Sequence, residues 1–344
     1  LDVLELNHFD ILQNKRVGLI VNHTSINRFD RQLADLIRIR GKIKNPVIFT
    51  PEHGFKGIGS AGELINNQKS YYDAKVVSLY GKNKKPNKED LLGIDALVFD
   101  LQDVGARYYT YASTLTLAMG AAAEMGIPFI VLDRPNPVRG DKIQGPILKT
   151  EYSSFVGMHP IPIRHGLTIG ELAVLINENG WLGDTLYTEL TVVPMGGWNR
   201  TMWFDETGIY WKPPSPNLPS LNTALAYLGT CLLEGTNISE GRGTYSPFLN
   251  IGAPWIEAEK FTKSLNQLNL LGVQFHPHTF LPVSMVNKAK YPKFENQECH
   301  GSRIIIFNKN TYNPILTGVG ILLTLESLYP DKFQWDENLF IDKL

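Results

Sequence analysis

A series of short, continuously apolar segments most limits what this chain can fold into. They are residues 17–22, 46–50, 76–79, 95–100 and 129–133. Residues 31–40 carry apolar side chains at helical spacing, and residues 113–125 form an alanine-rich stretch of helical character. Continuous apolar strands with helices between them are typical of a parallel sheet that is covered on both faces. The sequence therefore predicts an α/β fold with right-handed crossover connections.

The chain changes character after about residue 146. Prolines and aromatic residues gather at 158–162 and 210–219, which favours loops in both places. Between them one helix is expected at 168–179. Thr168 is suited to cap its first turn, and Glu171, three residues later, completes the pattern of a capping box.

Further strands are expected at 190–194 and 303–307, and we assign both to a second, smaller α+β unit. A chain of 344 residues exceeds what one hydrophobic core usually serves. We therefore expect a parallel-sheet domain at 1–145 and a smaller α+β domain at 146–344.

Composition excludes several classes of function. The chain has 33 basic and 34 acidic residues, so its net charge of -1 predicts neither nucleic acid nor an anionic membrane as a partner. No apolar run approaches the ~20 residues of a membrane span. No GxGxxG motif follows the first strand and no GxxxxGK[ST] motif occurs, so no nucleotide cofactor is expected. Cys231 and Cys299 lack the spacing of a zinc site, and no metal is expected; a disulfide and two free thiols both stay open.

Four loops with polar residues, glycine or proline follow the expected strands. They are residues 22–25, 51–57, 102–110 and 134–140. In an open parallel sheet, ligands bind outside the carboxyl ends of the strands. Because all four loops belong at that edge, the sequence predicts an active site there.

Glu52 is the first candidate, because it follows Pro51 directly at a strand end. A carboxyl group partly removed from water can act as a general acid, which is what cleavage of a glycosidic bond requires. The alternative is a hydrogen-bonded loop carboxylate, and both interpretations stay open on residue type alone. The neighbouring His53 is more often structural than catalytic.

A second group of candidates follows the strand at 95–100. Arg107 has the guanidinium that clamps a carboxylate, whereas an internal pair with Asp100 or Asp103 would only hold the loop. The same two interpretations apply to Arg134. Tyrosines at 108, 109 and 111 are suited to stack on a sugar ring, although they also suit a core.

Two further segments carry candidate residues. His165 precedes the expected helix at 168–179 and suits either a ligand or a loop hydrogen bond. Glu240 and Arg242 lie in a short glycine-flanked segment, where glycines favour close approach of the backbone to a ligand.

Taken together, these loops resemble a known family. The matching motifs are Val21-Asn-His-Thr-Ser25, Phe49-Thr-Pro-Glu-His-Gly-Phe-Lys-Gly57, Phe99-Asp-Leu-Gln-Asp-Val-Gly-Ala-Arg-Tyr-Tyr-Thr-Tyr111, Leu132-Asp-Arg-Pro-Asn-Pro137, Arg164-His-Gly166, Ser239-Glu-Gly-Arg-Gly-Thr244 and Ile251-Gly-Ala-Pro-Trp255. As an ordered set they are similar to the NamZ-type exo-β-N-acetylmuramidases. The resemblance implies a Rossmann-like domain without nucleotide, a smaller domain, and a cleft between the two.

The resemblance also implies a substrate and a set of site residues. The expected substrate is peptidoglycan, cut at a non-reducing terminal N-acetylmuramic acid, and the family's suspected catalytic glutamate corresponds to Glu52. Glu240 is our first candidate for a second catalytic group, and Asp100 is the next candidate. Family members are often exported, so a periplasmic or extracellular location is expected. The expected substrate-binding residues are Asn22, His23, His53, Asp100, Asp103, Arg107, Tyr109, Arg134, Asn136, His165 and Arg242.

The chemistry of N-acetylmuramic acid agrees with these residue types. Its lactyl carboxylate calls for a guanidinium, and its acetamido group calls for an amide or carboxylate partner. Competing hypotheses are a hydrolase of another amino sugar and a protein that binds murein fragments without cutting them. A metal-dependent hydrolase that uses His23, His53 and His165 is a weaker third, because no HExxH-type spacing is present.

Overall fold

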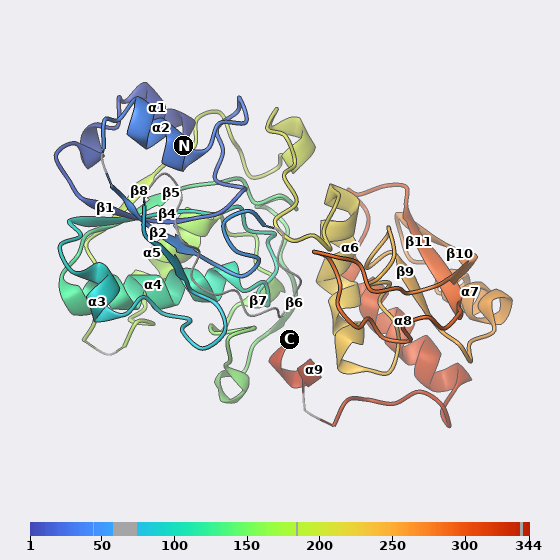
Figure 1. Ribbon diagram of the computed structural model, residues 1–344. Helices are drawn as coiled ribbons and strands as arrows, with labels where there is room; N and C mark the ends of the chain where they lie inside the picture. Colours follow the sequence, from blue (N-terminus) through green and yellow to red (C-terminus); the bar gives the residue numbers. More distant parts are fainter. Residues whose placement is uncertain (44, 58–73, 184, 338–339) are drawn as a thin grey trace.

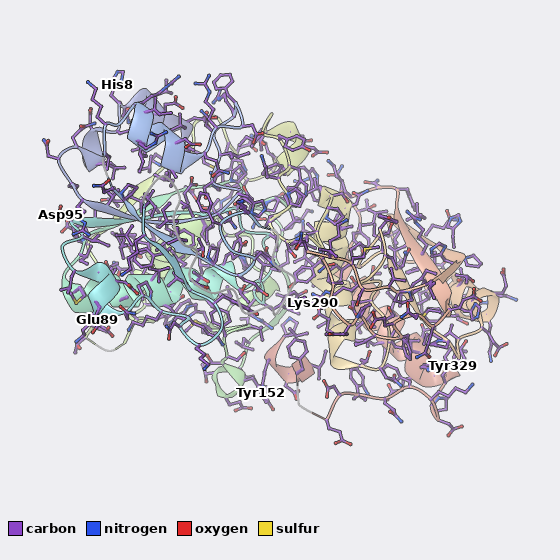
Figure 2. All side chains as sticks on the ribbon, viewed as in Figure 1. His8, Glu89, Asp95, Tyr152, Lys290 and Tyr329 are labelled. Atoms are coloured by element: carbon purple, nitrogen blue, oxygen red, sulfur yellow. The ribbon has the colours of Figure 1, made fainter. Side chains whose placement is uncertain are left out.

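The computed structural model describes residues 1–43, 45–57, 74–183, 185–337 and 340–344. They form a larger and a smaller lobe that lie side by side, with the two ends of the chain in different parts of the molecule (Figure 1). Side chains fill the space between the ribbons of both lobes (Figure 2).

A six-stranded sheet forms the centre of the larger lobe within the described residues. Its strands are β1 (Val17–Val21), β2 (Val47–Thr50), β3 (Val76–Ser78), β4 (Ala96–Asp100), β5 (Phe129–Leu132) and β8 (Leu190–Val193). They run in the order β3-β2-β1-β4-β5-β8, and every pair is parallel. The predicted α/β fold is confirmed, and its strand order is that of a doubly wound sheet.

Helices cover both faces of this sheet, because successive strand residues point to opposite sides. Leu19 and Val98 pack in a core beneath α1 and α2, whereas Phe49 and Phe99 pack in a second core with α4 and α5. The helical elements of the larger lobe are α1 (Asp2–Leu6), η1 (Asp10–Leu12), α2 (Leu33–Ile39), α3 (Lys88–Leu91), α4 (Tyr111–Met125), η2 (Thr150–Tyr152), α5 (Ile169–Glu178) and η3 (Phe204–Glu206). The predicted capping box of Thr168 and Glu171 is present at the start of α5.

An antiparallel ribbon and the smaller lobe complete the fold. The ribbon consists of β6 (Gln144–Ile147) and β7 (Pro162–Arg164). The smaller lobe contains α6 (Leu221–Thr230), η4 (Cys231–Gly235), β9 (Asn250–Ala253), α7 (Ala258–Gln267), β10 (Val273–Phe280), β11 (Cys299–Ile306), α8 (Pro314–Leu328) and α9 (Phe340–Lys343). Its antiparallel sheet has the order β10-β11-β9.

One strand lies in a different sheet from the one expected. Residues 190–194 were assigned to the smaller unit, but β8 pairs in parallel with β5 at the edge of the larger sheet. The apolar pattern identified the strand but could not specify its partner, because periodicity carries no information about which sheet a strand joins. The expected strand at 303–307 belongs to β11 in the smaller lobe. The predicted division of the chain at residue 145 stays a prediction.

A buried polar network fills the sheet edge between β1 and β4, where the strand order reverses direction. The Arg134 Nε donates to Asp100 Oδ1 at 2.5 Å, and both side chains are almost fully buried. Ser25 Oγ donates to the Asp100 carbonyl. The Gln102 amide N–H donates to Thr24 Oγ1 at 3.1 Å. In nucleotide-binding relatives of this topology the same point holds the ligand, so here the ligand site must lie elsewhere along the edge.

We expect Asp100→Ala to lower the free energy of unfolding by about 3–5 kcal/mol, because it leaves the buried Arg134 charge without its partner. Urea unfolding followed by circular dichroism measures the change. The matched control is Asp205→Ala, which removes an exposed ion pair with Lys309 and should cost less than about 1 kcal/mol. Equal losses in the two variants would contradict a central role for the buried pair.

Candidate functional site

A cavity of about 600 Å³ lies between the two lobes. The larger lobe contributes residues from the loops after β2, β3 and β4, which is the edge that sequence analysis predicted. The smaller lobe contributes residues from α6, η4 and the glycine-flanked segment, and α9 adds the last part of the wall. The described lining residues are Glu52, His53, Tyr80, Lys84, Tyr108, Tyr109, Thr110, Ser154, Phe155, Val156, Ser215, Leu218, Tyr227, Cys231, Glu234, Arg242, Phe248, Phe340, Lys343 and Leu344.

A tight turn at the end of β2 places Glu52 in this cavity. The Gly54 amide N–H donates to the Pro51 carbonyl at 3.0 Å and closes the turn. His53 occupies its third position with a φ of 70°, the left-handed conformation that a type II turn requires there. A residue other than glycine is strained in this conformation, and such strain is concentrated at functional sites. His53 is buried, so it anchors the turn while Glu52 is only half-buried.

Two hydroxyl groups surround the Glu52 carboxylate. Thr110 Oγ1, just before α4, donates to Glu52 Oε2 at 2.9 Å. The Tyr80 phenol, after β3, also hydrogen-bonds to Glu52. Burial, followed by the nearby charge of Glu52, raises the pKa of Tyr80 above its ordinary value, so the phenol stays a neutral donor. Three strand-end loops therefore orient one carboxyl group.

The turn that carries Glu52 also contacts the loop after β1. That loop contacts Pro213, in the segment that links the two lobes. A Cβ atom on Gly57 would lie 2.0 Å from Nδ1 of the His23 ring, so the two loops are in direct contact and glycine is required there. His23 Nε2 lies 2.7 Å from the Pro213 carbonyl, and the Tyr111 hydroxyl donates to the Pro214 carbonyl at 3.0 Å. Burial lowers the pKa of His23, which favours a neutral ring in this contact.

A chain of charged groups forms the cavity wall on the smaller lobe. Arg242 Nη1 lies 2.7 Å from Glu234 Oε2 and 3.7 Å from Glu240 Oε1. Burial opposes the charged form of Arg242, but the two carboxylates outweigh burial and raise the pKa of the guanidinium. Glu240 also lies 3.6 Å from Lys293 Nζ, behind Arg242. Glu234 is thus the carboxylate that reaches the cavity from this side.

Aromatic side chains line the cavity and connect the lobes. The ring of Tyr227 contacts the edges of Tyr108 and Tyr109, with centroids 5.2 and 6.3 Å away. Tyr227 also lies 4.9 Å from Phe248. These residues belong to one buried cluster that extends through both lobes. Faces of this kind are suited to sugar rings, whose C–H groups pack against aromatic surfaces while the hydroxyl groups find polar partners.

Four of the predicted catalytic and substrate-binding residues line the cavity: Glu52, His53, Tyr109 and Arg242. Tyr108, for which stacking on a sugar and packing in a core both stayed open, lines it as well. Other predicted ligand residues form hydrogen bonds within the protein. The Asn22 amide donates to Tyr111 at 2.7 Å and accepts from Thr24. Asn136 donates to the Leu167 carbonyl at 2.9 Å. Together with the ion pair of Asp100 and Arg134, these contacts hold the loops and lie outside the described lining of the cavity.

Arg107 is used inside the protein as well. Its guanidinium donates to the carbonyls of Pro146, at 2.7 Å, Ile161, at 2.6 Å, and Leu344. It therefore joins the β6–β7 ribbon to α9, the helix that closes one side of the cavity. Burial lowers the pKa of Arg107 to about 10, so it remains charged near neutral pH.

Asp103 and His165 form a buried pair, with Asp103 Oδ2 and His165 Nε2 3.8 Å apart. Burial raises the pKa of Asp103 to about 7 and lowers the pKa of His165 to about 4. The Gly105 amide N–H donates to Asp103 at 2.7 Å. Below pH 7 the structure therefore favours a protonated aspartate beside a neutral histidine, which is a structural arrangement.

Sequence reasoning missed several residues of the site. Glu234 lies in η4, whose sequence Cys-Leu-Leu-Glu-Gly has the pattern of a helix end. Tyr227 lies within α6 and Tyr80 after the short strand β3. The strand-end rule points to Tyr80, because this residue follows the predicted strand at 76–79. No comparable rule predicts ligand-binding positions in the smaller lobe, whose sheet is antiparallel.

The described residues contain no group of three or more His, Cys, Asp or Glu side chains placed to hold a metal ion. His23 and His165 contact separate backbone groups, the Pro213 carbonyl and the Leu167 amide. Cys231 and Cys299 are free thiols. Among the described helices, none has the length and hydropathy needed to cross a membrane.

Comparison with known proteins covers the whole chain. The family model described as the N-terminal part of exo-β-N-acetylmuramidase NamZ matches residues 17–222, and the C-terminal model matches residues 225–344. The peptidoglycan β-N-acetylmuramidase NamZ of Bacillus subtilis (strain 168) is 43% identical over 348 residues, which include 100% of this chain and 81% of that protein.

Solved structures share the fold. A DUF1343 family protein of Bacteroides fragilis NCTC 9343 matches with a TM-score of 0.86 and 37% identity, over 96% of this chain and 82% of that one. A second DUF1343 family protein of the same organism matches with a TM-score of 0.70 and 33% identity, over 90% of this chain and 78% of that one.

We expect Asp103→Asn to change how stability depends on pH. The folded state holds the pKa of Asp103 near 7, above its ordinary 3.8, so wild type loses stability as pH rises from about 4 to 7. Asparagine does not titrate. As pH rises through this window, the free energy of unfolding of the variant should therefore increase relative to that of wild type, by up to about 1.4 kcal/mol per pH unit.

Urea unfolding at a series of pH values measures this difference. The shift of His165 has the opposite sign, with stability lost as pH falls from 6.5 toward 4, but it is present in both proteins and largely cancels in the difference. A difference that stays constant between pH 4 and 7 would disprove the buried neutral aspartate.

Proposed function

Because the chain belongs to the exo-β-N-acetylmuramidase NamZ family, we propose that it removes N-acetylmuramic acid from the non-reducing end of peptidoglycan fragments. The chain is thus a glycoside hydrolase, and its substrates are saccharides derived from peptidoglycan. The observation that carries the proposal is the half-buried Glu52 carboxyl group, oriented by two hydroxyl groups in a cavity with aromatic walls. Peptidoglycan lies outside the cytoplasmic membrane, so we also propose a periplasmic or extracellular location.

Glu52 is the proposed proton donor. In hydrolysis the bond between C1 of the muramic acid and the glycosidic oxygen breaks, and the departing oxygen takes the proton of Glu52. A water molecule then supplies the hydroxyl group at C1, and its remaining proton returns to Glu52. Thr110 and Tyr80 act as positioning residues, because they hold the carboxyl group at the end of β2.

We propose Glu234, rather than Glu240, as the second carboxylate that faces the sugar. Glu234 lines the cavity, whereas Glu240 lies behind Arg242 and contacts Lys293. In this arrangement Glu240 acts through Arg242, whose charge it partly balances. The ion pair of Glu234 and Arg242 leaves both groups able to hydrogen-bond to sugar hydroxyls.

The lactyl carboxylate distinguishes N-acetylmuramic acid from N-acetylglucosamine, and the cavity offers cations to bind it. Arg242 is already paired with two carboxylates. Lys84 and Lys343 also line the cavity, and neither forms an ion pair with a carboxylate in the described part of the chain. Lys84 Nζ lies 4.3 Å from the centre of the Phe155 ring, at the mouth. We therefore assign the lactyl group to these two lysines.

An exo-acting enzyme needs a pocket that is closed behind the terminal sugar. Phe340, Lys343 and Leu344 of α9 and its end form one wall, and the carbonyl of Leu344 is bonded to Arg107 of the larger lobe. Ser154–Val156 forms the adjoining wall. We propose that these two walls bound the position of the terminal sugar.

We expect Glu52→Gln to lower kcat for the p-nitrophenyl β-glycoside of N-acetylmuramic acid by ~10²-fold or more, because the amide cannot donate the proton. Release of p-nitrophenol by wild type and variant measures it. The corresponding N-acetylglucosamine glycoside should react far more slowly with wild type.

Two matched variants separate the roles of the remaining carboxylates. Glu234→Gln should lower kcat strongly, and Glu240→Gln should act more weakly, through Arg242. Unchanged activity in Glu52→Gln would remove this residue from the mechanism. If wild type binds the muramic acid glycoside without cleaving it, the chain is a murein-binding protein, and preference for another glycoside would indicate a different amino sugar.

We expect the double variant Lys84→Ala, Lys343→Ala to raise KM for the muramic acid glycoside roughly 10-fold with little change in kcat, because ground-state binding of the carboxylate is lost. KM for the N-acetylglucosamine glycoside should stay near the wild-type value. The control is Lys85→Ala, since Lys85 is paired with Glu124 at 2.6 Å. Equal changes for both substrates would show that the two lysines do not recognise the lactyl group.

A further inference from the structure

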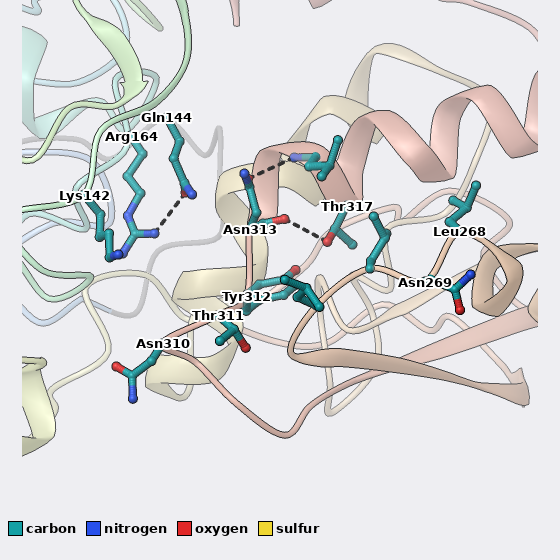
Figure 3. Close-up of a pocket in the computed structure, with 13 residues that line it drawn as sticks. Lys142, Gln144, Arg164, Leu268, Asn269, Asn310, Thr311, Tyr312, Asn313 and Thr317 are labelled. Carbon is teal, nitrogen blue, oxygen red and sulfur yellow. Dashed lines mark hydrogen bonds between the residues drawn. The ribbon is translucent and has the colours of Figure 1, made fainter.

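A second cavity, of about 370 Å³, also lies between the lobes (Figure 3). Lys142, Gln144 and Arg164 approach it from the β6–β7 ribbon, and the opposite wall consists of residues 268–271 and the start of α8. None of its described lining residues also lines the cavity that contains Glu52. Arg164, the first residue of the Arg164-His-Gly166 motif, therefore lines this second cavity and not the hydrolytic site.

Arg164 is a buried cation at the wall of this cavity, with 1% of its surface exposed. Its Nη1 donates to Gln144 Oε1 at 2.9 Å, and its Nη2 donates to the Val138 carbonyl. Its Nε has no hydrogen-bond partner within the described structure. Burial lowers the pKa of Arg164 to about 10, so the group remains charged near neutral pH. The guanidinium also lies 5.7 Å from the centre of the Trp203 ring. A buried cation that has no carboxylate partner is costly in a protein.

The carboxylates near this cavity are already paired with other cations. The pairs are Arg139 with Asp141 at 2.7 Å, Arg200 with Glu171 at 2.5 Å, and Lys309 with Asp205 at 2.5 Å. Asp141 also acts on the charge of Arg164 from a greater distance. Arg164 and Lys142 form no ion pair with a carboxylate among the described residues, so the cavity has an excess of positive charge.

The first turn of α8 adds to this positive potential. Asn313 caps the helix by accepting a hydrogen bond from the Leu316 amide, and Thr317 Oγ1 donates to the Asn313 carbonyl at 2.8 Å. All three residues line the cavity, so the positive end of a 15-residue helix faces it.

The remaining walls are apolar and amide-bearing. Leu268, Leu270, Leu271 and Leu316 form an aliphatic surface, and Asn269 and Asn310 supply amide groups at its edge. A ligand that suits these walls has an anionic group, a small alkyl group and an amide. An inorganic anion alone would leave the leucine surface without a contact.

We propose that this cavity binds a small amphipathic acid: a carboxylate beside a methyl-sized alkyl group and a secondary amide. The carboxylate lies against Lys142, in the field of Arg164 and the α8 terminus, and the alkyl group lies on the leucines. Two sources share this chemistry. One is N-acetylmuramic acid, through its lactyl and acetamido groups, and the other is the carboxyl end of a short peptide. Binding here does not require the proposed hydrolysis; only the choice of probes rests on it.

Isothermal titration calorimetry with intact protein tests the proposal, with N-acetylmuramic acid and N-acetyl-D-alanine as separate probes. The neutral sugar N-acetylglucosamine is the control ligand. Lys142→Glu reverses the charge, and Leu271→Trp fills the mouth at a side chain that is 72% exposed, so both variants should fold. Lys149→Glu, on the exposed surface of the same region, is the matched control.

We expect at least one acid probe to show a binding event that Lys142→Glu weakens at least 10-fold, Leu271→Trp removes and Lys149→Glu leaves unchanged. Binding of N-acetylmuramic acid in the hydrolytic cavity is a separate event, which the double variant Lys84→Ala, Lys343→Ala weakens and the three variants above retain. Activity on the muramic acid glycoside should stay at the wild-type level in all three variants, which separates this site from the hydrolytic one. Binding of N-acetyl-D-alanine alone identifies a peptide ligand, and binding of N-acetylmuramic acid alone identifies the sugar acid. If neither probe binds, or if both cavity variants bind as wild type does, the proposal is wrong.

Discussion

The buried ion pair of Asp100 and Arg134 determines where this fold is able to hold a ligand. It occupies the edge of the sheet between β1 and β4, where doubly wound sheets leave a crevice. Ser25, Thr24 and Gln102 add hydrogen bonds around it, so the crevice is filled by the protein itself. A ligand must instead bind beside this point, over the ends of β2 and β3 and the loop before α4. The topology is that of a nucleotide-binding fold, but the protein's own side chains occupy the crevice at its centre.

Because the site lies beside the sheet rather than at its centre, the larger lobe supplies only part of its walls. The remaining walls come from α6, η4 and α9. Their side chains keep a fixed position relative to Glu52 only if the two lobes keep a fixed arrangement. The contacts of Tyr108 with Tyr227 and the continuous buried cluster provide that arrangement. His23 and Tyr111 add polar contacts to the carbonyls of Pro213 and Pro214 in the linking segment. The geometry around Glu52 therefore depends on residues that never reach the cavity.

Sequence analysis predicted the larger lobe well, because continuous apolar strands and the strand-end rule apply directly to a parallel sheet. It identified Glu52 and His53 for that reason. It could not distinguish residues that bind a ligand from residues that build the edge: Asn22, Asn136 and Arg134 have the residue types of a sugar site but complete their hydrogen bonds internally. It missed Glu234 because no local pattern separates a site carboxylate from the end of a short helix. The prediction that β8 belongs to the smaller unit was wrong for a similar reason, because the apolar pattern of a strand does not identify the strand beside it.

The internal role of these loop residues also explains why so many family motifs lie away from the catalytic cavity. A catalytic carboxyl group on a loop is effective only when its position is held to a fraction of an ångström by rigid neighbours. Asn22 and Thr24 brace the β1 loop, and Gly57 brings the turn of Glu52 against it. A change in any of these contacts would move the acid without removing it. Arg164 donates to Gln144 in the ribbon and to the Val138 carbonyl in the loop after β5, and it also lines the other cavity. Support of the catalytic turn therefore accounts for the motifs around β1 and β4, but not for a buried Arg164 charge that forms no ion pair with a carboxylate among the described residues.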